Sequence, residues 1–192
     1  NIVKKAAFPK SISLNPADFH LITPKMAVKV GENVKAGDVV FYSKDNQEVK
    51  FCSPVSGIVK DIVRGKKRKI IEIIIDTDSF QKSKKFKTTN FKNFKRDDIK
   101  ASLLESGCWP FINQRPYDII ANPEDNPKSI FVSTLNTAPI SADIQIVLDD
   151  QKNEFTTGIQ VLRKLTDGDL NICVEKNHQT FINEINDVVI HN

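Results

Sequence analysis

Short apolar runs separated by turn-forming residues fill the first part of the chain. Between residues 26 and 75, β-branched and aromatic positions come in brief stretches, and glycine, proline, serine and asparagine stand between them. The longest stretch, residues 70–75, contains five isoleucines and one glutamate. Each stretch has the length of a strand, and the spacing between stretches is short. The pattern therefore predicts a small β barrel or sandwich.

The second part of the chain has a different pattern. Apolar runs typical of buried strands occur at 130–132, 144–148, 170–174 and 188–190. Apolar residues at helical spacing, Phe155, Ile159, Leu162 and Leu165, predict a helix over 154–166, and a short helix is expected over 181–185. Alternation of strand and helix predicts a parallel α/β sheet. Because the chain stops on its last predicted strand, we expect the protein to continue beyond it.

A basic segment separates the two patterns. Residues 81–96 contain lysine and arginine but no acidic residue, and they show no clean period, which predicts an exposed linker. Asp97 and Asp98 then form a predicted helix N-cap pair, and Gly107 is expected to end that helix. The predicted organisation is a β domain over 1–80, a basic linker over 81–98 and an α/β domain over 99–192.

The two halves of the chain also differ in charge. Residues 1–96 carry 21 lysines and arginines and 9 acidic residues, whereas residues 97–192 carry 7 and 15. The first half is therefore net +12 and the second net −8, which gives the overall +4. Such asymmetry indicates two domains whose surfaces face different partners, or face each other.

Several classes of chemistry have no support in the sequence. Cys52, Cys108 and Cys173 form no CxxC pair, which is typical of reduced thiols in a cytoplasmic protein. The three histidines form no ligand pair at helical spacing, so no metal site is expected. No P-loop, Ser/His/Asp set or carboxylate pair is recognisable, and we predict no catalytic residue. No apolar run is long enough to cross a membrane.

The region around Gly31 and Gly37, together with 53–59, resembles the barrel-sandwich hybrid fold of lipoyl and biotinyl domains. In a carrier domain of that fold, a lysine at the tip of a hairpin bears the cofactor. Here the tip falls on Asn46 or Gln47, and the nearest lysines lie off the tip. The resemblance therefore predicts the fold without the carrier chemistry, and no covalently bound cofactor is expected.

A longer series of motifs extends the resemblance to nearly the whole chain. The series comprises Thr23-Pro24-Lys25-Met26, Val28-Lys29-Val30-Gly31, Val49-Lys50-Phe51, Ser53-Pro54-Val55-Ser56-Gly57, Arg64-Gly65-Lys66-Lys67-Arg68, Leu103-Leu104-Glu105-Ser106-Gly107, Trp109, Arg115-Pro116, Ile130-Phe131-Val132, Pro139 and a helix with Phe155, Gly158, Leu162 and Leu165. In this order, the motifs look like those of the A subunit of the bacterial sodium-translocating NADH:quinone oxidoreductase.

The resemblance implies a role within a respiratory sodium pump. The A subunit of that complex is its peripheral member on the cytoplasmic face of the inner membrane, and it is associated with quinone. Flavins and the iron–sulfur centre are expected in other subunits. The implied partners are those subunits and quinone, with membrane association through the complex alone. A structural assembly subunit of this or the related Rnf complex, with no ligand of its own, is the alternative.

Within this resemblance, the second half is similar to flavin-binding Rossmann-like domains of related complexes. In those relatives a glycine-rich loop follows Leu-x-x-Ser-Gly and holds the flavin phosphate through backbone N–H groups. Here Trp109, Phe111 and two prolines occupy that loop, which predicts that flavin binding is lost. An aromatic pocket with Trp109, Phe111 and Arg115 would instead suit a quinone. As an alternative, these residues cap the core.

Two further sets of residues have competing interpretations. Ser133 and Thr134 end a predicted strand, where they either contact the quinone or cap a turn. Arg64, Lys66, Lys67 and Arg68 form a basic turn, which is either a solvated hairpin or a docking patch for an acidic partner or anionic lipid. Phenylalanines among the lysines of 82–96 would also suit single-stranded nucleic acid, but a linker is the commoner explanation, and no nucleic-acid partner is expected.

Overall fold

The structure, a computed structural model, describes residues 4, 6–86, 93–135, 138–175, 182 and 185–191. The chain divides into two compact units, one of residues 1–88 with 101–123 and the other of residues 89–100 with 124–192. Residues 87–92 of the predicted linker lie outside the described part, as do three of the five residues of the helix predicted over 181–185.

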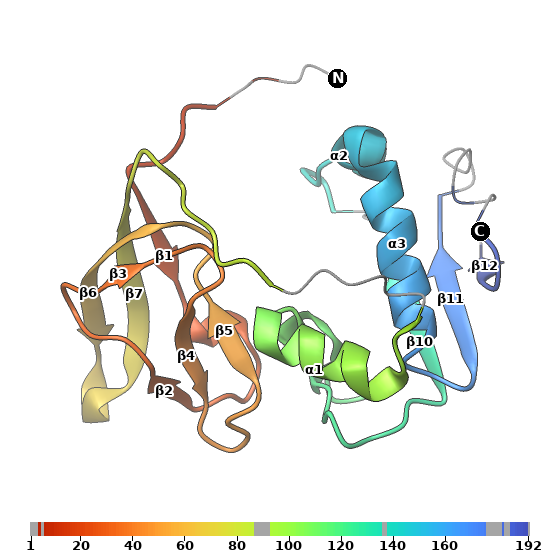
Figure 1. Cartoon of the computed structure of the whole chain (residues 1–192), viewed down its shortest axis with the longest axis horizontal. Helices are drawn as coiled ribbons and strands as arrows, with labels where there is room; N and C mark the ends of the chain where they lie inside the picture. The colour runs from red at the N-terminus through yellow and green to blue at the C-terminus, as the bar shows by residue number, and fades with distance from the viewer. Residues whose placement is uncertain are drawn as a thin grey trace. The chain divides into compact units, whose positions relative to one another are not determined.

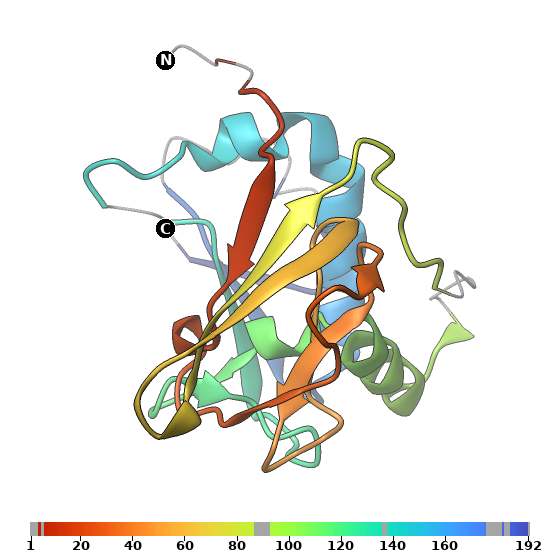
Figure 2. The same ribbon diagram turned by 90° about the vertical axis from the view of Figure 1, so that its left-hand side faces the viewer.

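The first unit is built from short antiparallel strands, as the sequence predicts. One sheet has the order β1 (Ser11–Leu14), β7 (Ile70–Thr77), β6 (Gly57–Arg64) and β3 (Asn33–Val34). Figures 1 and 2 show the long β6–β7 hairpin with β1 beside it. A second sheet joins β2 (Pro24–Met26), β4 (Val39–Ser43) and β5 (Lys50–Cys52). A 3-10 turn, η1 (Pro16–Asp18), follows β1.

The core of this unit follows the two-residue period of its strands. On β7, Ile73 and Ile75 are fully buried, whereas Ile74 between them, on the opposite face, is only partly buried. Val59 on β6 and Phe41 on β4 are also fully buried. Alternate residues of the two sheets therefore face a common apolar interior, which stabilises the unit by removing these side chains from water.

A polar cluster fixes the point at which the chain leaves the hairpin. The buried Ser56 hydroxyl donates to the Asp78 Oδ1 atom at 2.7 Å and accepts from the Lys82 N–H at 2.7 Å. The same carboxylate oxygen accepts from the N–H groups of Phe80 and Gln81 at 2.9 and 2.8 Å. This Ser56–Asp78 clamp turns the chain back along the first unit.

The start of the predicted linker then pairs with the first unit. The Ala36 N–H donates to the Lys82 carbonyl at 2.9 Å, and the Lys84 N–H donates to the Ala36 carbonyl at 2.7 Å. Ser83 thereby forms a parallel bridge with Ala36. The backbone of residues 82–84 is held by hydrogen bonds, while the Lys82 and Ser83 side chains are exposed.

Helix α1 (Arg96–Ser106) follows the basic segment. It begins one residue before the predicted cap pair, so Asp97 and Asp98 lie in its first turn, where they still face the positive end of the helix dipole. The Asp98 carboxylate accepts from the Lys95 N–H at 2.9 Å, while the Lys95 carbonyl accepts the first helical hydrogen bond. The predicted N-cap role therefore belongs to Lys95.

The predicted end of α1 at Gly107 is confirmed. Gly107 has a φ of +72°, the left-handed conformation that glycine adopts without a Cβ penalty. Its N–H donates to the Leu104 carbonyl at 3.4 Å, and the Cys108 N–H donates to the Leu103 carbonyl at 3.0 Å. These two bonds form a Schellman motif, which satisfies carbonyls at the helix terminus.

A compact loop completes the first unit. The 3-10 turn η4 (Trp109–Phe111) leads into a small antiparallel hairpin of β8 (Asn113–Gln114) and β9 (Ile119–Ile120). Residues 101–123 thus pack with the β strands although they follow the basic segment in sequence.

The second unit contains the predicted parallel sheet. Its strands are β10 (Ser129–Ser133), β11 (Asp169–Cys173) and β12 (Val189–His191), in that order. Helix α3 (Lys152–Arg163) packs Phe155, Ile159 and Leu162 against a core that includes Leu170 and Ile172. The predicted helix and the parallel strands on either side of it are therefore confirmed.

The strand predicted over 144–148 is wrong, because these residues form helix α2 (Ile144–Leu148). The 3-10 turn η5 (Asp149–Gln151) then leads to α3. A five-residue apolar run has no reliable period, and the Val147 N–H donates to the Asp143 carbonyl in helical fashion. Ile146 and Val147 are 43% and 48% exposed, so the run is not a buried strand.

Two glycines give opposite predictions for stability. An added Cβ at Gly57 would overlap the Asp76 carbonyl oxygen, whereas one at Gly158 on α3 would meet no atom within 4 Å. We expect Gly57→Ala to destabilise the first unit by about 2 kcal/mol or more. Gly158→Ala should stabilise the second unit by about 0.5–1 kcal/mol, because alanine loses less entropy in a helix. Urea denaturation, followed by Trp109 fluorescence and by circular dichroism, measures the free energy of unfolding of each variant. Equal changes in the two variants would contradict the different surroundings of Gly57 and Gly158.

The Ser56–Asp78 clamp predicts a pH dependence of stability. The hydrogen bond from Ser56 is the largest of the effects that lower the pKa of Asp78. Desolvation opposes it, and the N–H groups of Gln81 and Phe80 and the charge of Lys82 lower the pKa further. A lowered pKa stabilises the fold above the carboxyl's unfolded value, and this stabilisation is lost as pH falls through the folded value. We expect the loss below about pH 4.

Asp78→Asn removes this contribution, so its stability should fall less steeply between pH 6 and pH 3 than that of the unmodified chain. Thermal denaturation at each pH, monitored by Trp109 fluorescence, measures the slope. Asp61→Asn, at an exposed position on β6, is the matched control. Parallel curves for Asp78→Asn and the unmodified chain would contradict the role of the clamp.

Candidate functional site

The loop after α1 contains three of the predicted quinone contacts, and Trp109 is the most buried of them. Only 5% of Trp109 is exposed, and its indole N–H donates to the Ala121 carbonyl at 2.8 Å. Pro110 beside it is buried as well. The hydrogen-bond donor that sequence reasoning assigned to a quinone is therefore used within the first unit, where it fastens η4 to the residue after β9.

The backbone donors of the same loop are also bonded within the chain. The N–H groups of Gly107 and Cys108 cap α1. Those of Phe111 and Ile112 donate to the carbonyls of Cys108 at 3.3 Å and Trp109 at 2.9 Å. A phosphate cradle needs N–H groups that point outward and are free. These four are turned inward instead.

An aromatic series connects this loop to the core of the first unit. Phe41 and Phe51 stack with ring centroids 4.5 Å apart, and Phe19 meets Phe51 edge to face at 4.6 Å. Phe111 meets Phe19 at 6.1 Å and is itself 76% exposed. Sequence reasoning missed Phe19, because its partner Phe111 is far away in the chain and no local period connects them. The series ends at the surface in a flat apolar side chain.

Arg115 lies on the hairpin that follows. Its guanidinium is 3.7 Å from the Asp118 carboxylate, and both side chains are largely exposed. The structure therefore places Trp109, Phe111 and Arg115 in one loop of the first unit but in different settings. Phe111 and Arg115 are accessible to a ligand, whereas Trp109 supports them from the interior.

A shallow groove of about 270 Å³ lies in the same unit. It runs between the turn joining β4 to β5, the 20–22 segment and the 119–123 segment. Its apolar lining is Leu21, Ile22, Val49, Ile119 and Ile120, and its polar lining includes His20, Asp45, Asn46 and Asn122. Ala121, which accepts the Trp109 hydrogen bond, also lines it. Asn46, one of the two positions expected for the carrier-hairpin tip, thus lines a groove that the sequence did not indicate.

Ser133 and Thr134, the remaining predicted quinone contacts, lie at the end of β10 in the second unit. The Thr134 hydroxyl and N–H both donate to the Cys173 carbonyl, at 3.0 and 2.9 Å, and Thr134 is only 7% exposed. Ser133 is exposed, and its hydroxyl accepts from the Leu135 N–H at 3.2 Å. Thr134 therefore ties β10 to β11, and Ser133 forms a local turn.

The predicted basic turn joins β6 to β7 through η2 (Lys66–Arg68). Lys67 and Arg68 have positive φ values of 55° and 61°. Hydrogen bonds fix the turn: the Gly65 N–H donates to the Lys69 carbonyl at 2.8 Å, and the Arg64 guanidinium donates to the Arg68 carbonyl at 3.3 Å. The side chains of Arg64, Lys66, Lys67 and Arg68 are exposed, and within the described part of the chain no ion pair includes them.

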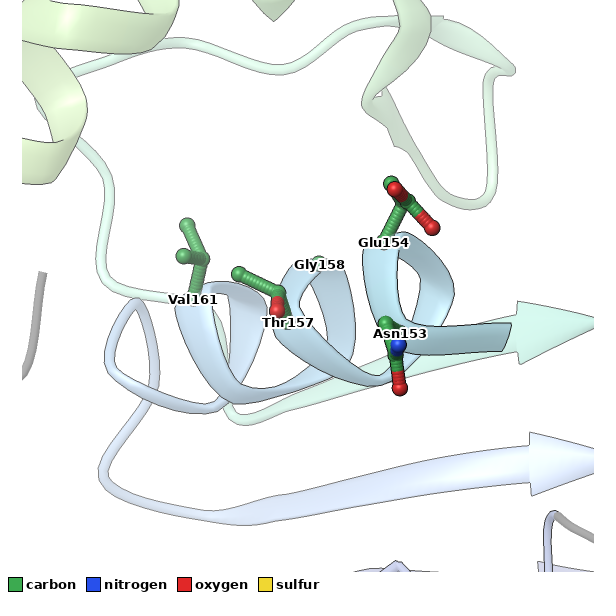
Figure 3. Close-up of a pocket in the computed structure, with 5 residues that line it drawn as sticks. All are labelled: Asn153, Glu154, Thr157, Gly158 and Val161. Atoms are coloured by element: carbon green, nitrogen blue, oxygen red, sulfur yellow. The ribbon is translucent and has the colours of Figure 1, made fainter. Parts of the chain in front are cut away.

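The second unit has an open hollow of about 410 Å³ on the exposed side of α3. Figure 3 shows its lining along the helix, Asn153, Glu154, Thr157, Gly158 and Val161. None of the predicted site residues is among them. Over the residues that the structure describes, no helix has the length and apolarity needed to cross a membrane. The same residues include no cluster of three or more histidine, cysteine or acidic side chains placed to hold a metal ion.

Comparison with protein families matches both parts of the chain. Residues 1–78 match the NqrA N-terminal barrel-sandwich hybrid domain, and residues 94–192 match the NqrA second alpha/beta domain. These matches confirm the fold class predicted from the sequence, with antiparallel strands in the first part and a parallel sheet in the second.

Individual relatives agree with the family match. The A subunit of the Na(+)-translocating NADH-quinone reductase of Pseudomonas aeruginosa strain PAO1 is 35% identical over 164 residues, 84% of this chain and 37% of the relative. The A subunit of the same enzyme from Psychromonas ingrahamii is 38% identical over 78% of this chain and 34% of its own length. The A subunit of the same enzyme from Tolumonas auensis is 32% identical over 92% of this chain and 40% of its own length. The chain thus spans well under half the length of these curated relatives. With both domains matched in order and more than 30% identity over most of its length, the chain belongs to the NqrA family.

Proposed function

We propose that this chain supplies the first two domains of the A subunit of a Na(+)-translocating NADH-quinone reductase. The observation that carries the proposal is the match of both domains, in order, to the two NqrA domains. Catalysis and sodium transport belong to the assembled complex, and the isolated chain is not catalytic. Its place is peripheral, on the cytoplasmic face of the inner membrane, where other subunits hold it.

The chain acts without a redox cofactor of its own. This part of the proposal is supported by the loop after α1, where Trp109 fills the interior and the N–H groups of Gly107, Cys108, Phe111 and Ile112 are bonded within the chain. These four N–H groups are not free to bind a flavin phosphate. Flavins and the iron–sulfur centre then belong to other subunits.

The same loop supports an association with quinone. A quinone ring needs flat apolar walls and one or two donors for its carbonyl oxygens. Phe111 is exposed at the end of the aromatic series, and the Arg115 guanidinium on the same loop is a charged donor. We assign the direct contacts to Phe111 and Arg115 and a supporting role to Trp109. Ser133 and Thr134, in the second unit, are the less favoured candidates.

The basic turn is the docking surface for an acidic partner subunit. Four cations stand on a turn whose backbone is fixed by internal hydrogen bonds, so they are presented in a constant arrangement. Exposed charges of this kind mainly accelerate association and fix orientation, and their effect weakens as salt rises.

Co-purification tests the assignment to the complex. We expect the tagged full-length protein that contains this chain to recover the other subunits and a Na⁺-stimulated NADH:quinone reductase activity from bacterial membranes. Replacing Arg64, Lys66, Lys67 and Arg68 with glutamine should reduce recovery several-fold at physiological salt. The matched control neutralises Lys10, Lys29, Lys44 and Lys85, four exposed lysines elsewhere on the first unit. Recovery of the tagged protein with no partner would overturn the assignment, and equal losses in both variants would overturn the docking role of the turn.

Titration with a short-chain quinone tests ligand binding, because Trp109 is the single tryptophan. We expect saturable quenching of its fluorescence at micromolar quinone. Phe111→Ala and Arg115→Gln should each weaken binding about tenfold, equivalent to ~1.4 kcal/mol. Ser133→Ala should leave the affinity unchanged, and a Trp109→Phe chain followed by a second probe controls for direct quenching. Quenching without saturation would favour the structural assembly subunit, and a loss confined to Ser133→Ala would move the contacts to the second unit.

A further inference from the structure

Two of the three cysteines lie beside each other where the end of α1 rests on β5. A Cβ added to Gly107 would lie 2.6 Å from the Cys52 Sγ atom and 3.0 Å from its Cβ atom. The backbone at Gly107 is therefore in direct contact with the Cys52 side chain. Cys108 is the next residue, and consecutive Cα atoms are about 3.8 Å apart. Cys108, far from Cys52 in sequence, is thus one residue away from a direct contact with it and is one of its electrostatic neighbours. A disulfide between them requires their Cα atoms to come within about 7 Å.

The two thiols differ in accessibility. Cys108 is exposed, whereas Cys52 is partly buried at the end of β5. The Schellman motif holds the Cys108 backbone through its hydrogen bond to Leu103, beside the Gly107 backbone that contacts Cys52. Cys173 lies on β11 in the second unit and is not part of the pair.

We propose that Cys108 and Cys52 form an oxidation site, in which a peroxide oxidises Cys108 and Cys52 then closes an intrachain disulfide. This site is independent of the quinone contacts and of assembly with other subunits. It lies wholly within the first unit, and the bond would fasten the 101–123 segment covalently to the β strands on which it packs.

The chemistry proceeds in two balanced steps. The Cys108 thiolate attacks one oxygen of hydrogen peroxide, the O–O bond breaks, and the departing hydroxide takes up a proton to become water. The Cys52 thiolate then attacks the sulfenic sulfur, the S–S bond forms, and the S–O bond breaks to release a second water. Overall, two thiols and one peroxide give a disulfide and two waters, and two electrons pass from sulfur to oxygen.

The environment of Cys52 makes the second step dependent on pH. Burial raises the pKa of the Cys52 thiol, and Lys84 opposes this effect. Cys108 and Asp38 also raise it, and Lys50 lowers it. Lys84 is in turn 3.8 Å from the Glu105 carboxylate on α1. Because the thiolate is the nucleophile, closure should accelerate as pH rises toward the pKa of Cys52.

The test is mass spectrometry of the reduced chain after a brief exposure to a small molar excess of hydrogen peroxide. Digestion with trypsin without reductant should link peptide 51–60 to peptide 101–128, because trypsin does not cut the Arg115–Pro116 bond. We expect this link to exceed any link to Cys173 at least tenfold, to disappear on reduction, and to form faster at pH 8.5 than at pH 7. The reduced and oxidised chains should differ in thermal stability, with the oxidised first unit melting higher.

Variants separate the roles of the two thiols. In Cys52→Ser, Cys108 should stop at the sulfenic acid, which dimedone traps, whereas Cys108→Ser should give little sulfenic acid at the same dose. Cys173→Ser is the matched control and should leave the link unchanged. Peptides linked at random, disulfides between chains, or equal oxidation of all three cysteines in the unmodified chain would overturn the proposal. Neither quinone nor the complex enters these measurements, so their outcome is separate from that of the proposed function.

Discussion

The pairing of β6 with β7 is the constraint on which the rest of the first unit depends. β1 and β3 reach the sheet only by pairing with one of these two strands. At the open end of the hairpin, Gly57 lies so close to the Asp76 carbonyl that no side chain fits there. The Ser56–Asp78 clamp then directs the chain from β7 back along the surface. One glycine and one buried hydroxyl therefore decide where the chain leaves the hairpin, and with it the start of the basic segment.

The same unit also fixes the loop on which the proposed function rests. Gly107 allows the end of α1 to approach Cys52, and the Trp109 indole closes the loop onto Ala121. In a nucleotide-binding loop, the glycine backbone stays free for the phosphate and the space beside it stays open. Here Cys52 covers the backbone of Gly107, and the Trp109 indole fills the interior. The tight packing removes the phosphate cradle and leaves a rigid surface that presents Phe111 and Arg115.

Charge has a separate role from packing in this chain. Four cations of the first half stand on the turn between β6 and β7, where hydrogen bonds hold the backbone. The burial of apolar residues on β7 ends where that turn begins, so the cations do not compete with the core. Such a turn would lose little backbone entropy on binding a partner, because its backbone is already fixed. Charges held in this way can orient the partner.

The features that could be predicted from the sequence follow from local periods and backbone rules. The β-branched run of β7, the helical spacing of Phe155, Ile159 and Leu162, and the glycine at the end of α1 are all visible in it, because each depends on residues a few positions apart. The run at 144–148 was misassigned, since five apolar residues have no distinguishing period.

Contacts between distant parts of the chain became visible only in the folded molecule. The series from Phe51 through Phe19 to Phe111, the hydrogen bond of Trp109 to Ala121 and the contact of Gly107 with Cys52 all join different elements. The packing of residues 101–123 with the first unit is another such contact between distant parts of the chain. Which side chains face one another across elements depends on the path of the backbone between them, and no local pattern encodes that path.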